Sequence, residues 1–244
     1  MDASVLRRRA GAAAGTYASI VLGFLGTIVA ARVFTTEVLG LYTLVIASAG
    51  FFQTLLDLTI EEALIKFGFR YIAREDWGRL QRIFRRTFAF KAVGAVLAGA
   101  ALVGLGLGAG TVFHHSELRT PLLIAALLPL AQSPEGMAAV PLMLRGRYDV
   151  RGGFLMLSMA LRLTAIAVGT HYGLTWTIVA IVLAQVAASA AIGAAGLAAF
   201  RRFPSAAPRP LGEDAREVLR FIVQSSIATG VVSLRTTLTP MLLG

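Results

Sequence analysis

The 244-residue sequence contains no cysteine. Disulfide bonds, thiolate catalysis and metal or iron–sulfur sites built on cysteine are therefore excluded. Charged residues are also scarce and make up 15% of the chain. Hydrophobic residues make up 57%, and the mean hydropathy is +0.74. Soluble domains typically contain about a quarter charged and about half apolar residues. The composition therefore predicts an integral membrane protein.

A series of apolar runs dominates the chain, and each is close to the roughly 20 residues that a helix needs to cross a hydrocarbon core. We expect six membrane spans, which cover residues 13–34, 38–64, 88–110, 120–143, 153–171 and 175–200. The first run is longer than the apolar part of a signal peptide, and Arg32 occupies the place of a small-residue cleavage site. The predicted fold class is all-α, a polytopic transmembrane helix bundle.

The spans divide the chain into three parts. Residues 1–200 are expected to form a six-helix transmembrane lobe, and residues 201–217, which are rich in proline and charge, a cytoplasmic linker. Residues 218–244 are expected to form the first helix of a second lobe. Because this apolar segment stops at Gly244 without a polar tail, we expect the sequence to be the N-terminal part of a longer protein.

The placement of lysine and arginine predicts the orientation. The loops on one side of the membrane contain Arg7, Arg8, Arg9, Lys66, Arg70, Arg74, Arg79, Arg82, Arg85, Arg86, Lys91, Arg145, Arg147, Arg151, Arg201, Arg202, Arg209, Arg216 and Arg220. The opposite loops contain Arg32 and Arg119. Since basic loops stay in the cytoplasm, we expect a cytoplasmic N-terminus. The amphipathic basic stretch 66–91 is expected to lie along the cytoplasmic interface.

Proline and glycine mark two of the predicted spans. The fourth contains the sequence Gln132-Ser133-Pro134-Glu135-Gly136, and a proline inside a helix removes a hydrogen bond and kinks the helix. We therefore expect a break deep in the membrane, where unpaired carbonyls face a cavity. The third span is rich in glycine, which indicates either close helix packing or a flexing element.

Three charged residues inside the spans are candidate substrate-binding residues, namely Arg162, Glu135 and Arg235. Arg162 lies roughly 13 Å into the fifth span, where an arginine costs at least about 2.5 kcal/mol unless it is paired or hydrated. A guanidinium that faces a cavity can clamp a pyrophosphate or an acidic sugar with two hydrogen bonds. The alternative is a structural ion pair with Glu135 at a comparable depth. Arg235 is a second candidate contact in the seventh span.

The second span ends in carboxylates. Asp57 and Glu61 are four residues apart and share a helix face, whereas Glu62 points about 100° away. All three are candidates for coupling transport to protons or sodium ions. Alternatively, they are charges at a helix end that meet Lys66 and Arg70.

Three local motifs lie between residues 30 and 71. They are Ala31-Arg32 at the end of the first span, Gly40-Leu41-Tyr42 at the start of the second, and the acidic group of Asp57, Glu61 and Glu62. In these motifs the chain resembles the polysaccharide transporters of the multidrug/oligosaccharidyl-lipid/polysaccharide (MOP) exporter superfamily. The resemblance implies two six-helix lobes around a central cavity, of which this chain contains the first lobe and the start of the second.

The resemblance also implies a flippase in the bacterial inner membrane. Such a protein moves an undecaprenyl-pyrophosphate-linked oligosaccharide, a unit of O-antigen, capsule or exopolysaccharide, to the outer leaflet by alternating access. The implied partners are this lipid-linked oligosaccharide, membrane lipids, and the polymerase and chain-length machinery of polysaccharide export. No cofactor, metal or nucleic acid is expected.

Two other functions compete with this interpretation. A cation-coupled multidrug antiporter of the same superfamily typically uses an acidic residue in the first span, but none occurs between Ala12 and Phe34. A membrane glycosyltransferase, ligase or acyltransferase needs a polar loop with a carboxylate cluster or an acceptor histidine. His115-Ser116-Glu117 is the one candidate for such a loop. We therefore expect a transporter and not an enzyme.

Overall fold

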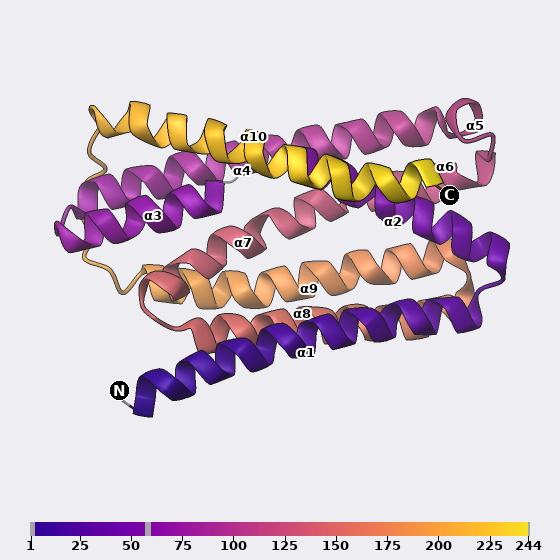
Figure 1. Cartoon of the computed structure of the whole chain (residues 1–244), viewed down its shortest axis with the longest axis horizontal. Helices are drawn as coiled ribbons and strands as arrows, with labels where there is room; N and C mark the ends of the chain where they lie inside the picture. The colour runs from indigo at the N-terminus through magenta and orange to yellow at the C-terminus, as the bar shows by residue number, and fades with distance from the viewer. Residues whose placement is uncertain (1–2, 57–59, 244) are drawn as a thin grey trace.

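The computed structural model describes residues 3–56 and 60–243, and these residues contain helices but no strand. Helix accounts for 87% of the structure. Among the described residues, six segments are long and apolar enough to cross a membrane: Ala10–Val33, Thr36–Thr54, Trp77–Leu107, Ser116–Leu144, Tyr148–Tyr172 and Leu174–Phe200. They lie alongside one another in one bundle (Figure 1). The predicted all-α, multi-pass membrane fold is confirmed.

The second pass contains α2, which covers Thr36–Leu56, and it is followed by α3, which covers Ile60–Ala73. Residues 57–59 lie outside the described residues, so the continuous span predicted over 38–64 stays a prediction. Glu61 lies in the first turn of α3, where an acidic side chain interacts favourably with the positive end of the helix dipole.

α3 turns back into α4, which covers Trp77–Leu107. Asp76 caps α4 because its carboxylate accepts a hydrogen bond of 3.1 Å from the Arg79 amide. Tyr71 of α3 and Leu80 of α4 are buried in the same apolar cluster, which holds the two helices together as a hairpin. The basic stretch 66–91 is thus divided between two helices, and its position along the cytoplasmic interface stays a prediction.

The fourth pass does break, although not where the sequence predicts. It begins with short helical turns and continues in two helices, in the order α5 (Ala109–Val112), η1 (Ser116–Leu118), α6 (Arg119–Ala125) and α7 (Leu128–Leu144). Pro129 lies in the first turn of α7. Amides in this turn have no acceptor within the helix, so the lack of an amide hydrogen in proline costs no helical hydrogen bond there. The break therefore precedes Pro129, and the predicted break at 132–136 is wrong.

α7 continues through Pro134 because a side chain replaces the lost backbone bond. Pro134 cannot donate to the Leu130 carbonyl four residues earlier. The hydroxyl of Ser133 donates to that carbonyl instead, at 3.2 Å. The polar residues around Pro134 consequently lie on a regular helix.

Close contact between backbones holds the remaining helices together. These are α1 (Ala3–Val33), α8 (Tyr148–Gly169), the turn η2 (Thr170–Tyr172) and α9 (Leu174–Phe200). α1 packs along α8, and a Cβ on Gly15 would overlap the Gly152 backbone. In α4, Gly99 faces the Ala126 carbonyl, as the packing interpretation of the glycine-rich span predicts. Lipid supplies no hydrophobic drive for helix association, so such contacts provide the van der Waals attraction.

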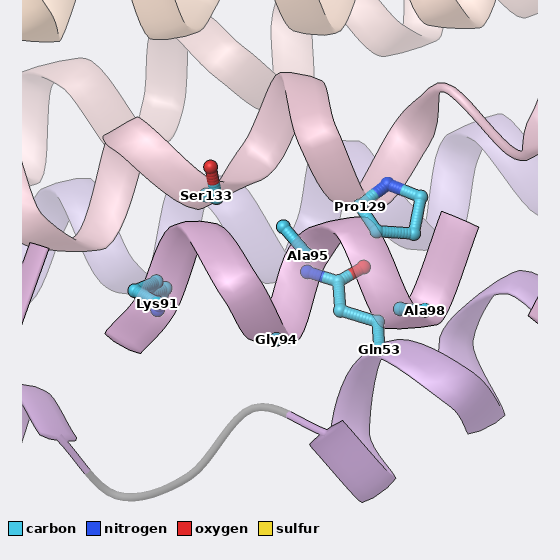
Figure 2. Close-up of a pocket in the computed structure, with 7 residues that line it drawn as sticks. All are labelled: Gln53, Lys91, Gly94, Ala95, Ala98, Pro129 and Ser133. Atoms are coloured by element: carbon cyan, nitrogen blue, oxygen red, sulfur yellow. The ribbon is translucent and has the colours of Figure 1, made fainter. Parts of the chain in front are cut away.

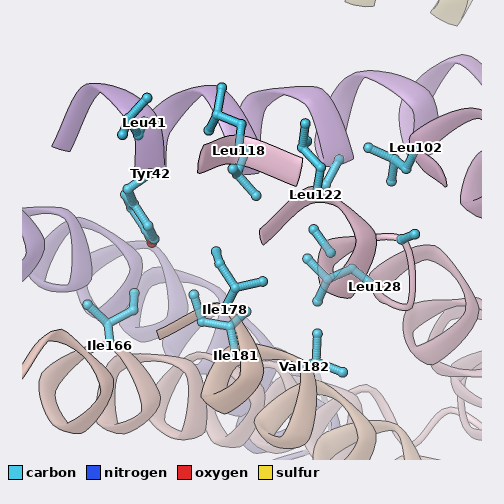
Figure 3. Packing of buried hydrophobic residues seen from close by; sticks show 14 of the residues in the cluster. Leu41, Tyr42, Leu102, Leu118, Leu122, Leu128, Ile166, Ile178, Ile181 and Val182 are labelled. Carbon is cyan, nitrogen blue, oxygen red and sulfur yellow. The ribbon is translucent and has the colours of Figure 1, made fainter. Parts of the chain in front are cut away.

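The two largest apolar clusters belong to elements that lie at opposite ends of the bundle in Figure 1. The first lies at the end near α6 and includes Leu41, Tyr42, Leu102, Leu118, Leu122, Leu128, Ile166, Ile178, Ile181 and Val182 (Figure 3). The second lies at the α3–α4 turn and includes Ile60, Leu64, Phe67, Tyr71, Leu80, Ile83, Met137, Val140 and Leu144. The helices between these clusters carry the polar side chains described below.

α10 covers Asp214–Leu243 and so begins within the expected linker. Arg70 of α3 binds Glu217 of α10 through two hydrogen bonds, of 2.6 and 2.8 Å. These bonds raise the pKa of Arg70 and lower the pKa of Glu217. Burial and the neighbouring Asp214 carboxylate raise the pKa of Tyr71 to about 12. The start of α10 is therefore attached to the α3–α4 hairpin.

Replacement of Gly196 by alanine tests the packing of α9 on α7. The added methyl group would overlap the Ala138 carbonyl, and overpacking of this kind typically costs about 1–3 kcal/mol. We expect a lower unfolding temperature for Gly196→Ala in detergent, measured by size-exclusion chromatography after heating. Gly193→Ala is the matched control, because a Cβ at Gly193 meets nothing within 4 Å. An equal loss of stability in both variants would contradict the packing described here.

Candidate functional site

Polar side chains form a layer across the middle of the bundle. The layer includes Lys91 of α4, Glu135 of α7 and Gln185 of α9. On α4, Lys91 lies between Ile83 of one apolar cluster and Leu102 of the other. Hydrocarbon offers no partner to charged or amide groups at this depth, so the protein itself must supply one.

Glu61 and Lys91 form an ion pair between α3 and α4. Their side chains are 28% and 10% exposed, so the pair is largely enclosed by the protein. The Glu61 carboxylate rests against the backbone of Gly136 in α7, where any Cβ would overlap it. Gly136 therefore makes the space in which the ion pair forms, and three helices meet at this point.

Glu135 is the centre of a second polar contact. Its carboxylate accepts a hydrogen bond of 2.6 Å from the Gln185 amide nitrogen, which also contacts the Ser189 hydroxyl at 3.2 Å. The Gln185 side-chain oxygen accepts a hydrogen bond of 3.2 Å from Gln132. The hydroxyl of Ser158 in α8 also faces the Glu135 carboxylate. Within the described residues Glu135 has no ion pair, so its partners are neutral.

A polar cavity of about 220 Å³ adjoins both contacts. Glu61, Lys91 and Glu135 line it together with Gln53 of α2 and Arg151 of α8. A smaller cavity of about 20 Å³ lies beside Gln53 and Lys91 (Figure 2), and that volume is large enough to hold about one water molecule. The layer thus combines both signs of charge with room for a polar ligand.

A larger cavity of about 450 Å³ lies between α1, α2 and α8. Arg162 lines it together with Tyr42, whose hydroxyl interacts with the guanidinium group. Gly23 and Gly26 of α1 also line this cavity. Arg162 and Arg151 are about three turns apart and share one face of α8. This face therefore presents a cationic side chain to each of the two cavities.

The structure decides between several sequence-based alternatives. The part of the chain that it describes contains no ion pair between Arg162 and Glu135, so the predicted structural pair is wrong. Glu61 pairs with Lys91 and not with a basic residue of its own helix. Lys66 instead lies over the Phe221 ring, with its Nζ 4.2 Å from the centroid.

Three other predicted site residues are less informative. Glu62 is exposed and lies in no ion pair with a described residue. Asp57 lies outside the described residues, and Arg235 belongs to α10 but its side chain is not among those described. The roles assigned to all three stay predictions.

Sequence reasoning missed Lys91, Gln185 and Gly136 as site residues. The basic cytoplasmic stretch predicted from the sequence includes Lys91. Its apolar neighbours on both sides, which include Phe88 and Phe90, are the signal that places it inside a membrane span. Gln185 interrupts an alanine-rich and valine-rich helix, which is a usable signal. The contact between Gly136 and Glu61 leaves no signal, because it joins segments that are distant in the sequence.

A family model described as polysaccharide biosynthesis protein matches residues 10–244, which is nearly the whole chain. The chain belongs to the polysaccharide biosynthesis protein family. This is the family of polysaccharide transporters in the MOP superfamily, so the resemblance predicted from residues 30–71 is confirmed. No curated protein and no solved structure matches this polysaccharide transporter.

A double-mutant cycle measures the Glu61–Lys91 ion pair in this polysaccharide transporter. We expect Lys91→Met to lower the free energy of unfolding strongly, because it leaves the enclosed Glu61 carboxylate without this lysine. The double variant Lys91→Met, Glu61→Gln should recover part of that loss of stability. The coupling energy should be about 1–3 kcal/mol. The exposed pair Arg147–Asp149 is the control, with an expected coupling below about 1 kcal/mol. Similar coupling in both cycles would show that the layer does not depend on this pair.

Proposed function

We propose that this polysaccharide transporter is a flippase for a lipid-linked oligosaccharide. The substrate would be an oligosaccharide on a polyprenyl pyrophosphate such as undecaprenyl pyrophosphate, moved from the cytoplasmic to the outer leaflet of the bacterial inner membrane. Membership of the family supports a transporter that acts in polysaccharide biosynthesis. The anionic substrate class is supported by Arg151 and Arg162, which line the two cavities and have no carboxylate partner among the described residues.

The observation that carries the proposal is the environment of Arg162. Its guanidinium lines a cavity of about 450 Å³ between α1, α2 and α8, and no carboxylate of the described residues pairs with it. An arginine at this depth is costly unless something compensates its charge. A pyrophosphate can do so, since its oxygens match the two-pronged hydrogen bonding of a guanidinium.

The shared face of α8 supports a path for the head group. Arg151 lines the cavity of the polar layer, and Arg162 lies about three turns farther along α8, beside Tyr42 and Ile166 of the apolar cluster near α6. In the proposed cycle the pyrophosphate meets Arg151 and then Arg162 as the lobe rocks against a second lobe, while the prenyl chain remains in lipid. Alternating access of this kind moves a polar group without exposing it to hydrocarbon.

The carboxylates of the polar layer are the proposed site of ion coupling. Glu61 is neutralised by Lys91, so an ion can reach Glu61 only when this pair opens. Glu135 has neutral partners and faces the same cavity, which makes it accessible to a proton. The proposal is a transporter without enzymatic activity, and it includes the polymerase and chain-length machinery as partners.

Arg162→Gln in the full-length gene tests the proposal. In a strain that lacks the chromosomal copy, lipid-linked repeat units should accumulate at the cytoplasmic face and surface polysaccharide should disappear. We expect Arg162→Gln to restore export at least about tenfold less well than the wild type, because one hydrogen bond to a charged group contributes about 1.5–3 kcal/mol.

Arg32→Gln is the matched control, because Arg32 is exposed in the last turn of α1 and lines neither cavity. The control should restore export fully, and both variants should reach wild-type levels in the membrane. Normal export by Arg162→Gln would overturn the role of the guanidinium. Intact surface polysaccharide in the deletion strain, together with new sensitivity to cationic drugs, would favour an antiporter.

A further inference from the structure

A groove of about 290 Å³ separates α4 from α10. α10 packs on α2 and α3, and it runs alongside α4 in the bundle (Figure 1). The groove is lined mainly by apolar side chains, among them Ile83, Phe90, Leu219 and Ile222. It shares no lining residue with the cavities that contain Arg151 and Arg162. It is therefore a separate site from the one proposed for the substrate.

Two arginines are the charged residues of this groove, Arg86 from α4 and Arg216 from α10. Both are exposed, and neither forms an ion pair with any described residue. The acidic residues near Arg216 are already engaged, since Asp214 pairs with Arg79 at 3.2 Å and Glu217 pairs with Arg70. The charge left at the groove is therefore positive.

At the groove, exposed arginines give way to exposed apolar side chains, which is the pattern expected where a membrane changes from head groups to hydrocarbon. Arg86 comes directly before the apolar part of α4, and Phe90, one turn later, is 57% exposed. On α10, Arg216 is followed by Leu219, which is 59% exposed. A guanidinium at such a boundary extends toward the polar side while its helix enters the lipid.

We propose that this groove binds an anionic phospholipid of the surrounding leaflet. Its phosphate lies between Arg86 and Arg216, and one of its acyl chains occupies the apolar lining. Basic pockets between membrane helices on the cytoplasmic side are a recognised site for anionic head groups. Since the two arginines come from different helices, the bound lipid joins α4 to α10 and strengthens the attachment of α10 to the lobe. The proposal does not depend on the flippase activity.

The test is lipid binding to the purified full-length protein, measured by native mass spectrometry with phosphatidylglycerol and, separately, phosphatidylcholine. The wild type should retain phosphatidylglycerol in preference to phosphatidylcholine. The double variant Arg86→Gln, Arg216→Gln should weaken phosphatidylglycerol binding roughly thirtyfold, because each arginine near a membrane surface contributes about 1 kcal/mol to the binding free energy. Should the double variant fail to fold, Arg216→Gln alone should weaken binding about fivefold.

Arg85→Gln with Arg220→Gln is the matched control, because both arginines are exposed on the same two helices but do not line the groove. The control removes the same charge and should bind phosphatidylglycerol like the wild type. Equal losses in both double variants, or equal binding of the two phospholipids, would overturn the site. Displacement of phosphatidylglycerol by an equimolar polyprenyl phosphate would also overturn it and would assign the groove to the transported lipid.

Discussion

Contact between helix backbones is the interaction on which the rest of this structure depends. Gly15 meets Gly152 where α1 crosses α8, and Gly196 meets the Ala138 carbonyl where α7 lies on α9. Within a bilayer, helices gain nothing by hiding apolar side chains from lipid that is equally apolar. Close packing at glycine residues therefore provides the attraction between helices that burial of apolar side chains provides in water. The contact at Gly196 brings α7 and α9 close enough for the Gln185 amide to donate a hydrogen bond of 2.6 Å to Glu135.

The polar groups of the bundle follow two different patterns. Glu61, Lys91 and Gln185 are bound by other side chains of the described structure, which compensates the cost of placing them at mid-membrane depth. Arg162 and Arg151 face cavities and lack a carboxylate partner among the described residues. Groups of the first kind hold helices together. Groups of the second kind have the charge and the room to bind an anion.

The sequence predicts the spans well and their interruptions poorly. Apolar runs locate the six passes that the described residues contain, because only a long helix satisfies its backbone inside a bilayer. The interruptions depend on which neighbour replaces a missing hydrogen bond. Pro134 marks no break because Ser133 bonds the Leu130 carbonyl, whereas Pro129, at the start of α7, follows a real one. The packing of α3 on α4, α7 and α10 is likewise recorded by no local pattern.

The sequence by itself determined that this protein is an all-α membrane protein of the polysaccharide biosynthesis family, since hydropathy and a few local motifs are properties of contiguous residues. It also singled out Arg162, because one charge in an apolar run is conspicuous. Only the tertiary structure decided that Glu61 pairs with Lys91, that Glu135 binds Gln185 instead of Arg162, and that Arg86 and Arg216 share a groove. Each of these contacts joins helices that are distant along the chain, and their formation depends on where the glycines allow those helices to meet.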